Sequence, residues 1–111
     1  SLARRMQQAA KNGKLYREKP FVMGETAKDV LVDSKSQEMV LIQGIIDVFF
    51  EEEGEMVLLD YKTDRIRTGK ELAERYRAQI QLYKSAIERA TGKKVKEQLL
   101  YSFCLSEVVE L

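Results

Sequence analysis

The segment 39–50 constrains the fold of this 111-residue chain more than any other, because apolar residues fill both of its alternating positions. One face of the expected strand would carry Asp47 with Leu41, Ile45 and Phe49, and the other would carry Ile42, Ile46, Val48 and Phe50. Apolar residues on both faces are typical of a central strand that is buried on both sides. We therefore expect a sheet with this strand near its centre.

The segments before this strand predict a helix and a less regular strand. Residues 1–12 favour a helix, which Gly13 ends. Residues 14–25 favour a strand that Pro20 places at a sheet edge or makes irregular. Residues 27–38 have no clear period and predict a short strand and a loop.

The segments after it predict a hairpin, a long helix and a last strand. Glutamates around Gly54 indicate a solvated hairpin tip, and residues 56–63 return as the second strand. Thr68-Gly69-Lys70-Glu71 has the form of a capping box, so a helix is expected from there to about Ala90, before Gly92. Its buried stripe would contain Leu72, Tyr76, Ile80, Tyr83 and Ile87. Residues 99–105 predict a last strand and 108–111 a short addition.

This α-β-β-β-α-β order describes one α/β domain, with a central mixed sheet flanked by helices. The formal net charge is +1, so any DNA-binding surface must be a local patch. The single cysteine, Cys104, excludes an internal disulfide framework. No stretch approaches the ~20 apolar residues of a membrane span, and none has the basic-then-apolar pattern of a signal segment.

Two aspartates and a lysine interrupt the apolar strands of the expected hairpin. Asp60 follows Asp47 by thirteen residues, and Lys62 lies on the same strand face as Asp60. Charged side chains are rarely buried unless they are paired or bound to a metal. Phosphodiester hydrolysis needs an activated water and a place for negative charge, and Mg²⁺ or Mn²⁺ supplies both through oxygen ligands. Asp47, Asp60 and the Tyr61 carbonyl would bind such an ion, while Lys62 would orient or help deprotonate the water.

The same residues also fit a purely structural interpretation. Asp60 and Lys62 would then be a salt-bridged pair on a solvated sheet face, and Asp47 an edge charge near the hairpin. The apolar neighbours Leu41, Ile45 and Phe49 favour partial burial of Asp47 and therefore the metal site.

Gln79 and Tyr83 lie four residues apart on the core-facing stripe of the long helix. A tyrosine in such a stripe is usually part of the core, with its hydroxyl bonded at the edge. A glutamine is less expected there, because its amide needs partners. It would hold a metal-bound water, a catalytic side chain or the DNA backbone.

A short basic stretch leads into this helix. It contains Lys62, Arg65, Arg67, Lys70, Arg75 and Arg77. Such residues suit phosphate contacts, to which the helix N-terminus adds its own attraction for anions. Asp64, Glu71 and Glu74 are interleaved with them, so a solvated helix face accounts for at least half of these cations.

Three motifs together resemble the RecB-like nucleases of the PD-(D/E)XK superfamily. They are Gly44-Ile45-Ile46-Asp47, Asp60-Tyr61-Lys62-Thr63-Asp64 and Gln79-Ile80-Gln81-Leu82-Tyr83, which occur in that family's order and spacing. Arg17-Glu18-Lys19-Pro20-Phe21 resembles the family's first core strand. The resemblance extends from Lys14 to the C-terminus, and the tail with Tyr101-Ser102-Phe103 and Val108-Val109-Glu110 is most similar to the nuclease domains of bacterial helicase–nuclease subunits. It implies a restriction-endonuclease-like core.

The resemblance also implies a function and a role for each motif. Asp47, Asp60 and the Tyr61 carbonyl would bind Mg²⁺, for which Mn²⁺ substitutes, and Lys62 would be catalytic. Gln79 and Tyr83 would support the site and contact DNA, together with Arg65, Arg67 and Lys70, and Glu18 would be accessory. The implied activity is a cytoplasmic, nucleoid-associated bacterial deoxyribonuclease, an exonuclease that hydrolyses single-stranded DNA during double-strand break repair and recombination. Its partners would be ATP-driven helicase domains of the same parent chain and a second nuclease subunit.

One departure from that family is the absence of histidine, because its members usually carry a histidine metal ligand on a helix upstream of the first strand. We expect that the chain is part of a larger helicase–nuclease and starts after that helix. The alternative is a non-catalytic DNA- or subunit-binding module that keeps the fold, although degeneracy would normally erase the Asp-X-Lys motif, which is intact. A weaker alternative is a small structural domain whose charges are all surface pairs.

The missing ligand predicts that the isolated 111-residue chain cleaves DNA poorly or not at all, because one metal ligand fewer weakens metal affinity. The measurement is cleavage of labelled single-stranded DNA by the purified chain in Mg²⁺. Clear Mg²⁺-dependent cleavage would contradict this prediction.

Overall fold

The computed structural model describes residues 1–26 and 39–111, so the strand and loop expected over 27–38 lie outside the described residues. The elements follow in the order α1 (Leu2–Lys11), β1 (Leu15–Thr26), β2 (Met39–Glu52), β3 (Glu55–Lys62), α3 (Gly69–Thr91), β4 (Val95–Ser102) and β5 (Glu107–Glu110). In this part of the chain the strands form one five-stranded sheet in chain order. β3 and β4 are parallel and the other neighbours antiparallel, which confirms the predicted mixed sheet.

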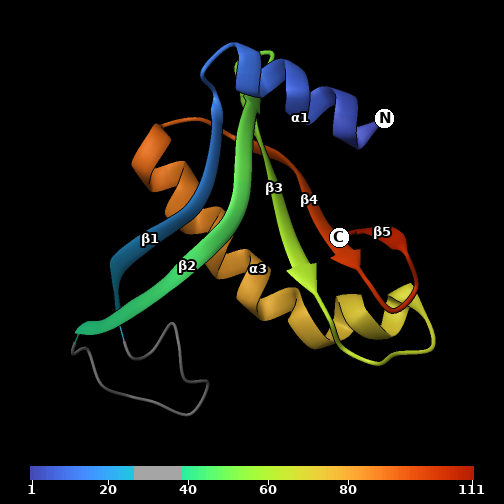
Figure 1. The fold of residues 1–111 in the computed structure, drawn as a ribbon. Coiled ribbons are helices and arrows are strands. Elements are labelled where there is room, and N and C mark those ends of the chain that lie inside the picture. Colours follow the sequence, from blue (N-terminus) through green and yellow to red (C-terminus); the bar gives the residue numbers. More distant parts are fainter. Residues whose placement is uncertain (27–38) are drawn as a thin grey trace.

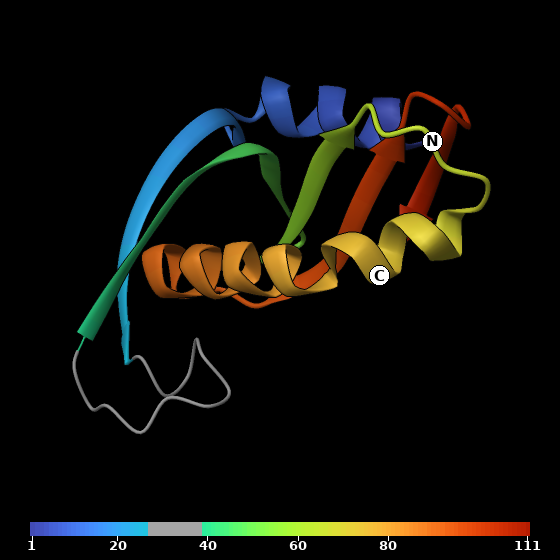
Figure 2. The same ribbon diagram turned by 90° about the horizontal axis from the view of Figure 1, so that it is seen from below.

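The two helices of the described residues lie on opposite sides of the sheet (Figures 1 and 2). α3 crosses beneath the strands as seen in Figure 2, while α1 covers the other face. β1 and β2 together form a long curved arm that extends beyond the rest of the sheet (Figure 1). The predicted α/β architecture is therefore present as three layers.

Each face of the sheet has its own buried core. On the α3 side, helix residues pack against strand residues of this group: Ile46, Phe49, Leu58, Leu100, Leu72, Ile80 and Ile87. On the α1 side, Ala9 packs with Val48, Phe50, Val57, Leu59 and Leu99. The alternation of Val57, Leu58 and Leu59 between these cores explains why β3 is apolar at every position from Met56 to Leu59.

The regular alternation of side chains along β2 is interrupted at Asp47. Ile46 and Phe49 both pack on the α3 side, whereas Val48 packs on the α1 side. A regular strand would place Ile46 and Val48 together. On the paired strand β1, Glu18 adopts a left-handed backbone with φ 49° at the position opposite Asp47. The irregularity that Pro20 predicts in this strand is therefore centred on Glu18.

This change of face corrects two expectations for β2. Leu41 and Ile45 are 75% and 58% exposed, so the strand is buried on both sides only in its second half. They therefore do not bury Asp47, whose half-buried carboxylate accepts a hydrogen bond from Tyr61 N at the end of β3.

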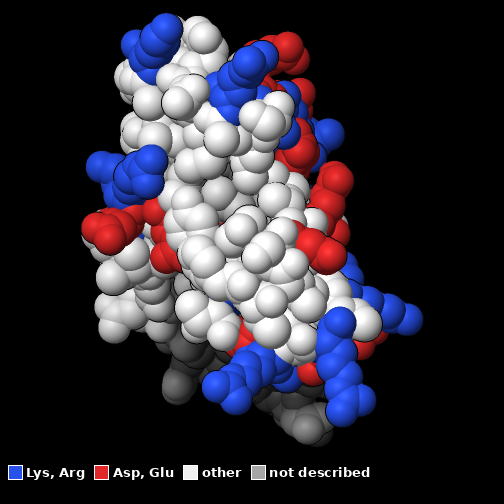
Figure 3. All heavy atoms as spheres, turned by 45° about the vertical axis from the view of Figure 1, so that its right-hand side comes forward, with Lys and Arg blue, Asp and Glu red and all other residues white. Residues whose placement is uncertain are grey.

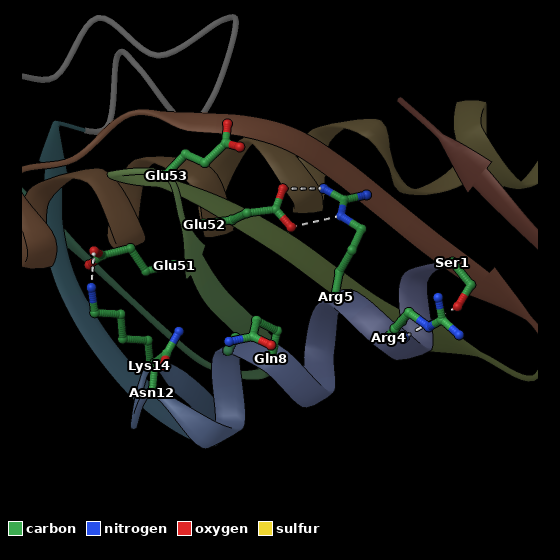
Figure 4. A pocket seen from close by; sticks show the side chains of 10 residues that line it. Ser1, Arg4, Arg5, Gln8, Asn12, Lys14, Glu51, Glu52 and Glu53 are labelled. Atoms are coloured by element: carbon green, nitrogen blue, oxygen red, sulfur yellow. Dashed lines mark hydrogen bonds and ion pairs between the residues drawn. The ribbon is translucent and has the colours of Figure 1, made fainter.

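Helix α1 is fastened to the β2–β3 hairpin by ion pairs (Figure 4). The Arg5 guanidinium donates to both carboxylate oxygens of Glu52 at 2.9 Å and also contacts Glu97. Hydrogen bonds from Arg5 and Lys96 lower the pKa of Glu52 to about 2. The hairpin expected to be solvated is thus exposed only at its tip, because Glu52 is half-buried against α1 and β4.

The ends of α3 follow the sequence signals closely. Thr68 Oγ1 accepts a hydrogen bond from Glu71 N at 3.2 Å, and Gly92 ends the helix with φ 71°. In a capping box the Glu71 carboxylate would accept from the backbone N–H of the N-cap residue, Thr68. It accepts instead from Arg67 N, one residue earlier, at 3.1 Å. Neither described helix is long and apolar enough to cross a membrane.

The α1-side core predicts a large difference between two phenylalanines that differ in burial. Phe50 is 0% exposed and Phe103 is 55% exposed. Phe50→Ala is expected to lower the free energy of unfolding by about 3–5 kcal/mol, because it removes buried apolar surface and leaves a cavity. Phe103→Ala, the matched control, is expected to cost about 1 kcal/mol or less. Urea unfolding followed by circular dichroism measures both, and equal losses would contradict this assignment of the core.

Candidate active site

The candidate site lies where β2 and β3 stop pairing. Their ladder runs from Glu52 opposite Glu55 to Val48 opposite Leu59 and ends there. The next residue of β2, Asp47, accepts a hydrogen bond from Tyr61 N through Oδ2 at 2.9 Å. A side-chain carboxylate thus takes the place of the strand partner and satisfies a backbone donor that the ladder leaves open. We call the place where β2 and β3 separate, between Asp47 and residues 60–61, the fork.

The fork brings Asp47 and Asp60 together, because continuing the register by one step places them opposite each other. Asp60 Oδ2 lies 2.7 Å from Lys62 Nζ, with side-chain exposures of 4% and 13%. The two charges do pair, as the structural interpretation held, but they lie on a buried face and not on a solvated one. Although this ion pair is close, no directional hydrogen bond from the described residues reaches Asp60 Oδ2.

The pKa of Asp60 is raised by its burial and by the neighbouring carboxylate of Asp47. Burial, together with a hydrogen-bond contact to Asp47, raises the pKa of Asp60 to about 6, and Lys62 opposes this shift. Asp60 thus carries a negative charge at neutral pH at a cost to stability, which a cation at the fork would offset.

The Lys62 ammonium is held from α3 as well as from β3. Its Nζ donates to Gln79 Oε1 at 2.8 Å and lies 3.8 Å from the centre of the Tyr76 ring. Of the three partners considered for Gln79, the structure shows the lysine side chain. The sequence pattern predicts Tyr76 in the helix stripe but assigns it no role at the site. Its position three residues before Gln79 was the available signal, because such residues share a helix face.

Tyr83, like Gln79 and Tyr76, belongs to α3. Its ring packs edge-on against Phe21 with centroids 5.5 Å apart. Burial raises the pKa of Tyr83, and the negative charges of Asp60 and Asp47 raise it further. A Cβ at Gly44 would lie 3.1 Å from the Phe21 ring and 3.6 Å from Tyr83, which explains a glycine at the start of the Gly44–Asp47 motif.

Glu18 and Arg17 border the fork from β1. With Asp47, Val48 and Tyr61 they line an open hollow of about 410 Å³. Tyr61 N points toward β2, and in an extended strand the N–H and C=O of one residue share an edge. The Tyr61 carbonyl therefore lies on the β2 side of β3, as a third oxygen at the fork.

These oxygens suit a hard divalent cation, but they do not form a complete ligand set. The described residues contain no group of three or more His, Cys, Asp or Glu side chains that could hold a metal. Magnesium is commonly bound by one or two carboxylates and keeps several waters, so two carboxylates and a carbonyl fit that ion. The buried Asp60 Oδ2 without a directional hydrogen bond is the observation that supports this fit.

The predicted DNA contacts Arg65, Arg67 and Lys70 have exposed side chains between β3 and the first turn of α3. None of the three forms a side-chain ion pair with a described residue, whereas Arg75 pairs with Asp64 at 2.8 Å. On the side of the molecule shown in Figure 3, lysines and arginines stand at the margins of a wide uncharged surface. The structure thus leaves three cations available but forms no single basic surface on this side.

Because the pKa of Asp60 is raised, this residue should make the folded state less stable as the pH rises, whereas an acidic group with a lowered pKa makes it more stable. Its folded-state pKa of about 6 exceeds the unfolded value near 3.8, so its stabilising contribution is complete below pH 4 and is lost as the pH rises through 6. In metal-free buffer the wild type should lose about 2–3 kcal/mol more than Asp60→Asn between pH 4 and 7. Urea unfolding at each pH measures this, and parallel stability curves would contradict it.

Comparisons with known proteins agree with this geometry. Residues 1–108 match the PD-(D/E)XK nuclease superfamily. The chain is 45% identical over 115 aligned residues to the ATP-dependent helicase/nuclease A-subunit of Thermoanaerobacter sp. (strain X514), and 44% identical over 118 to that of Clostridium perfringens (strain SM101 / Type A). Each alignment covers 99% of this chain but only 9% of the relative, so the chain spans about a tenth of these proteins. The chain belongs to the PD-(D/E)XK nuclease superfamily and has the restriction-endonuclease-like fold of that family.

Proposed function

We propose that this chain is the nuclease domain of an AddA-like helicase–nuclease and hydrolyses phosphodiester bonds of single-stranded DNA. Membership of the superfamily supports a nuclease-type hydrolase, and such nucleases generally use divalent metal ions. The observation that carries the proposal is the convergence of Asp47, Asp60 and Lys62 at the fork. We assign Mg²⁺ as the ion, with Mn²⁺ as a substitute, because the donors are oxygens.

The residues at the fork divide the work of such a reaction. Asp47, Asp60 and the Tyr61 carbonyl would hold the ion, which supplies Lewis acidity toward water and phosphate when bound. Lys62 places a positive charge beside them, where it orients the attacking water and offsets charge that develops on the phosphate. Gln79 keeps that ammonium directed at the fork through its 2.8 Å hydrogen bond.

The DNA strand would reach the fork from the exposed cations. Arg65, Arg67 and Lys70 would contact phosphates, and Tyr83 and Gln79 would contact the strand beside the scissile bond. Helicase domains of the same parent protein would supply single-stranded ends, and the partner would be an AddB-like nuclease protein. In this proposal the protein is cytoplasmic and acts as an exonuclease in double-strand break repair.

A non-catalytic DNA- or subunit-binding module remains the second candidate function. The incomplete set of metal ligands among the described residues favours it. The two candidates differ in metal binding, because only the enzyme requires a cation at Asp60.

Two substitutions, one at the metal ligand Asp60 and one at the catalytic Lys62, distinguish the nuclease from the binding module. In calorimetric Mn²⁺ titration, we expect heat from the wild-type chain and none from Asp60→Ala, because this variant lacks a central ligand. In the full-length protein, Lys62→Ala should lower kcat for single-stranded DNA by about 10²–10⁴-fold while leaving the Mn²⁺ heat in place.

Lys94→Ala is the matched control, because Lys94 is exposed in the connection between α3 and β4 and should leave the rate unchanged. The absence of metal-dependent heat in the wild-type chain would favour the binding module. A Lys62→Ala rate equal to that of wild type would remove the lysine from the mechanism.

A further inference from the structure

The second aspartate of the Asp60–Asp64 motif lies away from the fork but contacts the ring that holds Lys62. Tyr76 Oη donates to Asp64, with distances of 2.9 Å to Oδ1 and 2.8 Å to Oδ2. The opposite part of the same side chain, the ring face, lies 3.8 Å from Lys62 Nζ. Tyr76 thus connects the end of the motif to its central residue.

Asp64 is itself held in place. Arg75 Nη1 donates to Asp64 Oδ2 at 2.8 Å, and its Nη2 contacts Glu71 Oε1 at 3.4 Å. The hydrogen bonds from Arg75 and Tyr76 lower the pKa of Asp64, so it is a carboxylate at neutral pH and accepts from the phenol. The phenol end of the ring is therefore fixed at the surface, while its face is directed at the ammonium.

The contacts of Lys62 show what the ring adds. Asp60 Oδ2 is an ion-pair partner 2.7 Å from Nζ, Gln79 Oε1 is a hydrogen-bond acceptor at 2.8 Å, and the π-face of Tyr76 is a third attractive surface. An ammonium has three N–H donors, so with these contacts it has few alternative orientations. A leucine at position 76 would keep the stripe apolar but would offer no negative face to a cation.

We propose that Tyr76 and Asp64 are positioning residues that fix the Lys62 ammonium at the fork. This inference rests on the proposed function for the catalytic role of Lys62, but not for the position of its side chain. It assigns a purpose to the second aspartate of the motif: Asp64 holds the phenol, and the ring holds the lysine.

Nuclear magnetic resonance tests the geometry without any catalysis. Protons near the face of an aromatic ring are shifted upfield, so the ε-CH₂ signals of Lys62, identified by their loss in Lys62→Arg, should lie upfield of those of exposed Lys94. Tyr76→Leu should return them to the Lys94 position, because it removes the ring. Tyr76→Phe and Asp64→Ala should both give a smaller upfield shift than wild type, because each keeps the ring but removes the hydrogen bond that anchors it. Tyr16→Leu, which changes a half-buried tyrosine stacked on Phe49, should leave the shift unchanged.

An activity measurement then tests positioning. In the full-length protein, Tyr76→Leu should lower kcat for single-stranded DNA about tenfold with KM within about threefold. Tyr76→Phe and Asp64→Ala should give rates between those of Tyr76→Leu and wild type, because each keeps the ring without its anchor. Lys62 signals that coincide with those of Lys94 in the wild type would overturn the proposal, as would a Tyr76→Leu protein with full kcat. An upfield shift of the Lys62 signals, together with a full-length wild-type protein that cleaves no DNA, would instead reject the proposed function and leave the ring–lysine contact established.

Discussion

The hydrogen bond from Tyr61 N to the Asp47 carboxylate is the contact on which the candidate site depends. It forms where the β2–β3 ladder ends, so it closes the hairpin at the point where the two strands separate. The same carboxylate contacts Asp60, which gives one side chain both a structural and a chemical role. Without the separation of the strands, β2 backbone would occupy the hollow beside Tyr61, and no carbonyl or carboxylate would be open to a ligand.

A second constraint is the burial of Asp60 beside two half-buried charges, Asp47 and Lys62, which do not fully compensate one another. Lys62 neutralises one of the two carboxylates, and burial together with the remaining negative charge raises the pKa of Asp60. A site that bound its lysine and both aspartates in perfect balance would be more stable but would have no affinity left for a cation. The excess negative charge at the fork is thus consistent with a place for a divalent ion.

The elements that carry the site could be predicted from the sequence because their signals are local. The Gly54 hairpin, the Thr68 cap and the Gly92 stop define β3 and α3, and the period-2 pattern places Asp60 and Lys62 on one face. The change of face at Asp47 could not be predicted from the local pattern, because it coincides with a left-handed residue, Glu18, in the neighbouring strand. The alternation rule therefore predicted two buried neighbours of Asp47, Leu41 and Ile45, that are exposed, although it gave the right partner, Asp60. The link from Asp64 to Tyr76 was missed for a similar reason, since it joins a loop to a helix twelve residues away.

The contacts of Lys62 have a mechanical consequence. Two of its three partners belong to α3, a rod about 35 Å long, whereas the third belongs to its own strand. A shift of the helix along its axis by roughly the length of one hydrogen bond would withdraw Gln79 and Tyr76 together and leave the ammonium with Asp60 alone. The orientation of the Lys62 side chain therefore depends on the position of the whole helix α3 on the sheet.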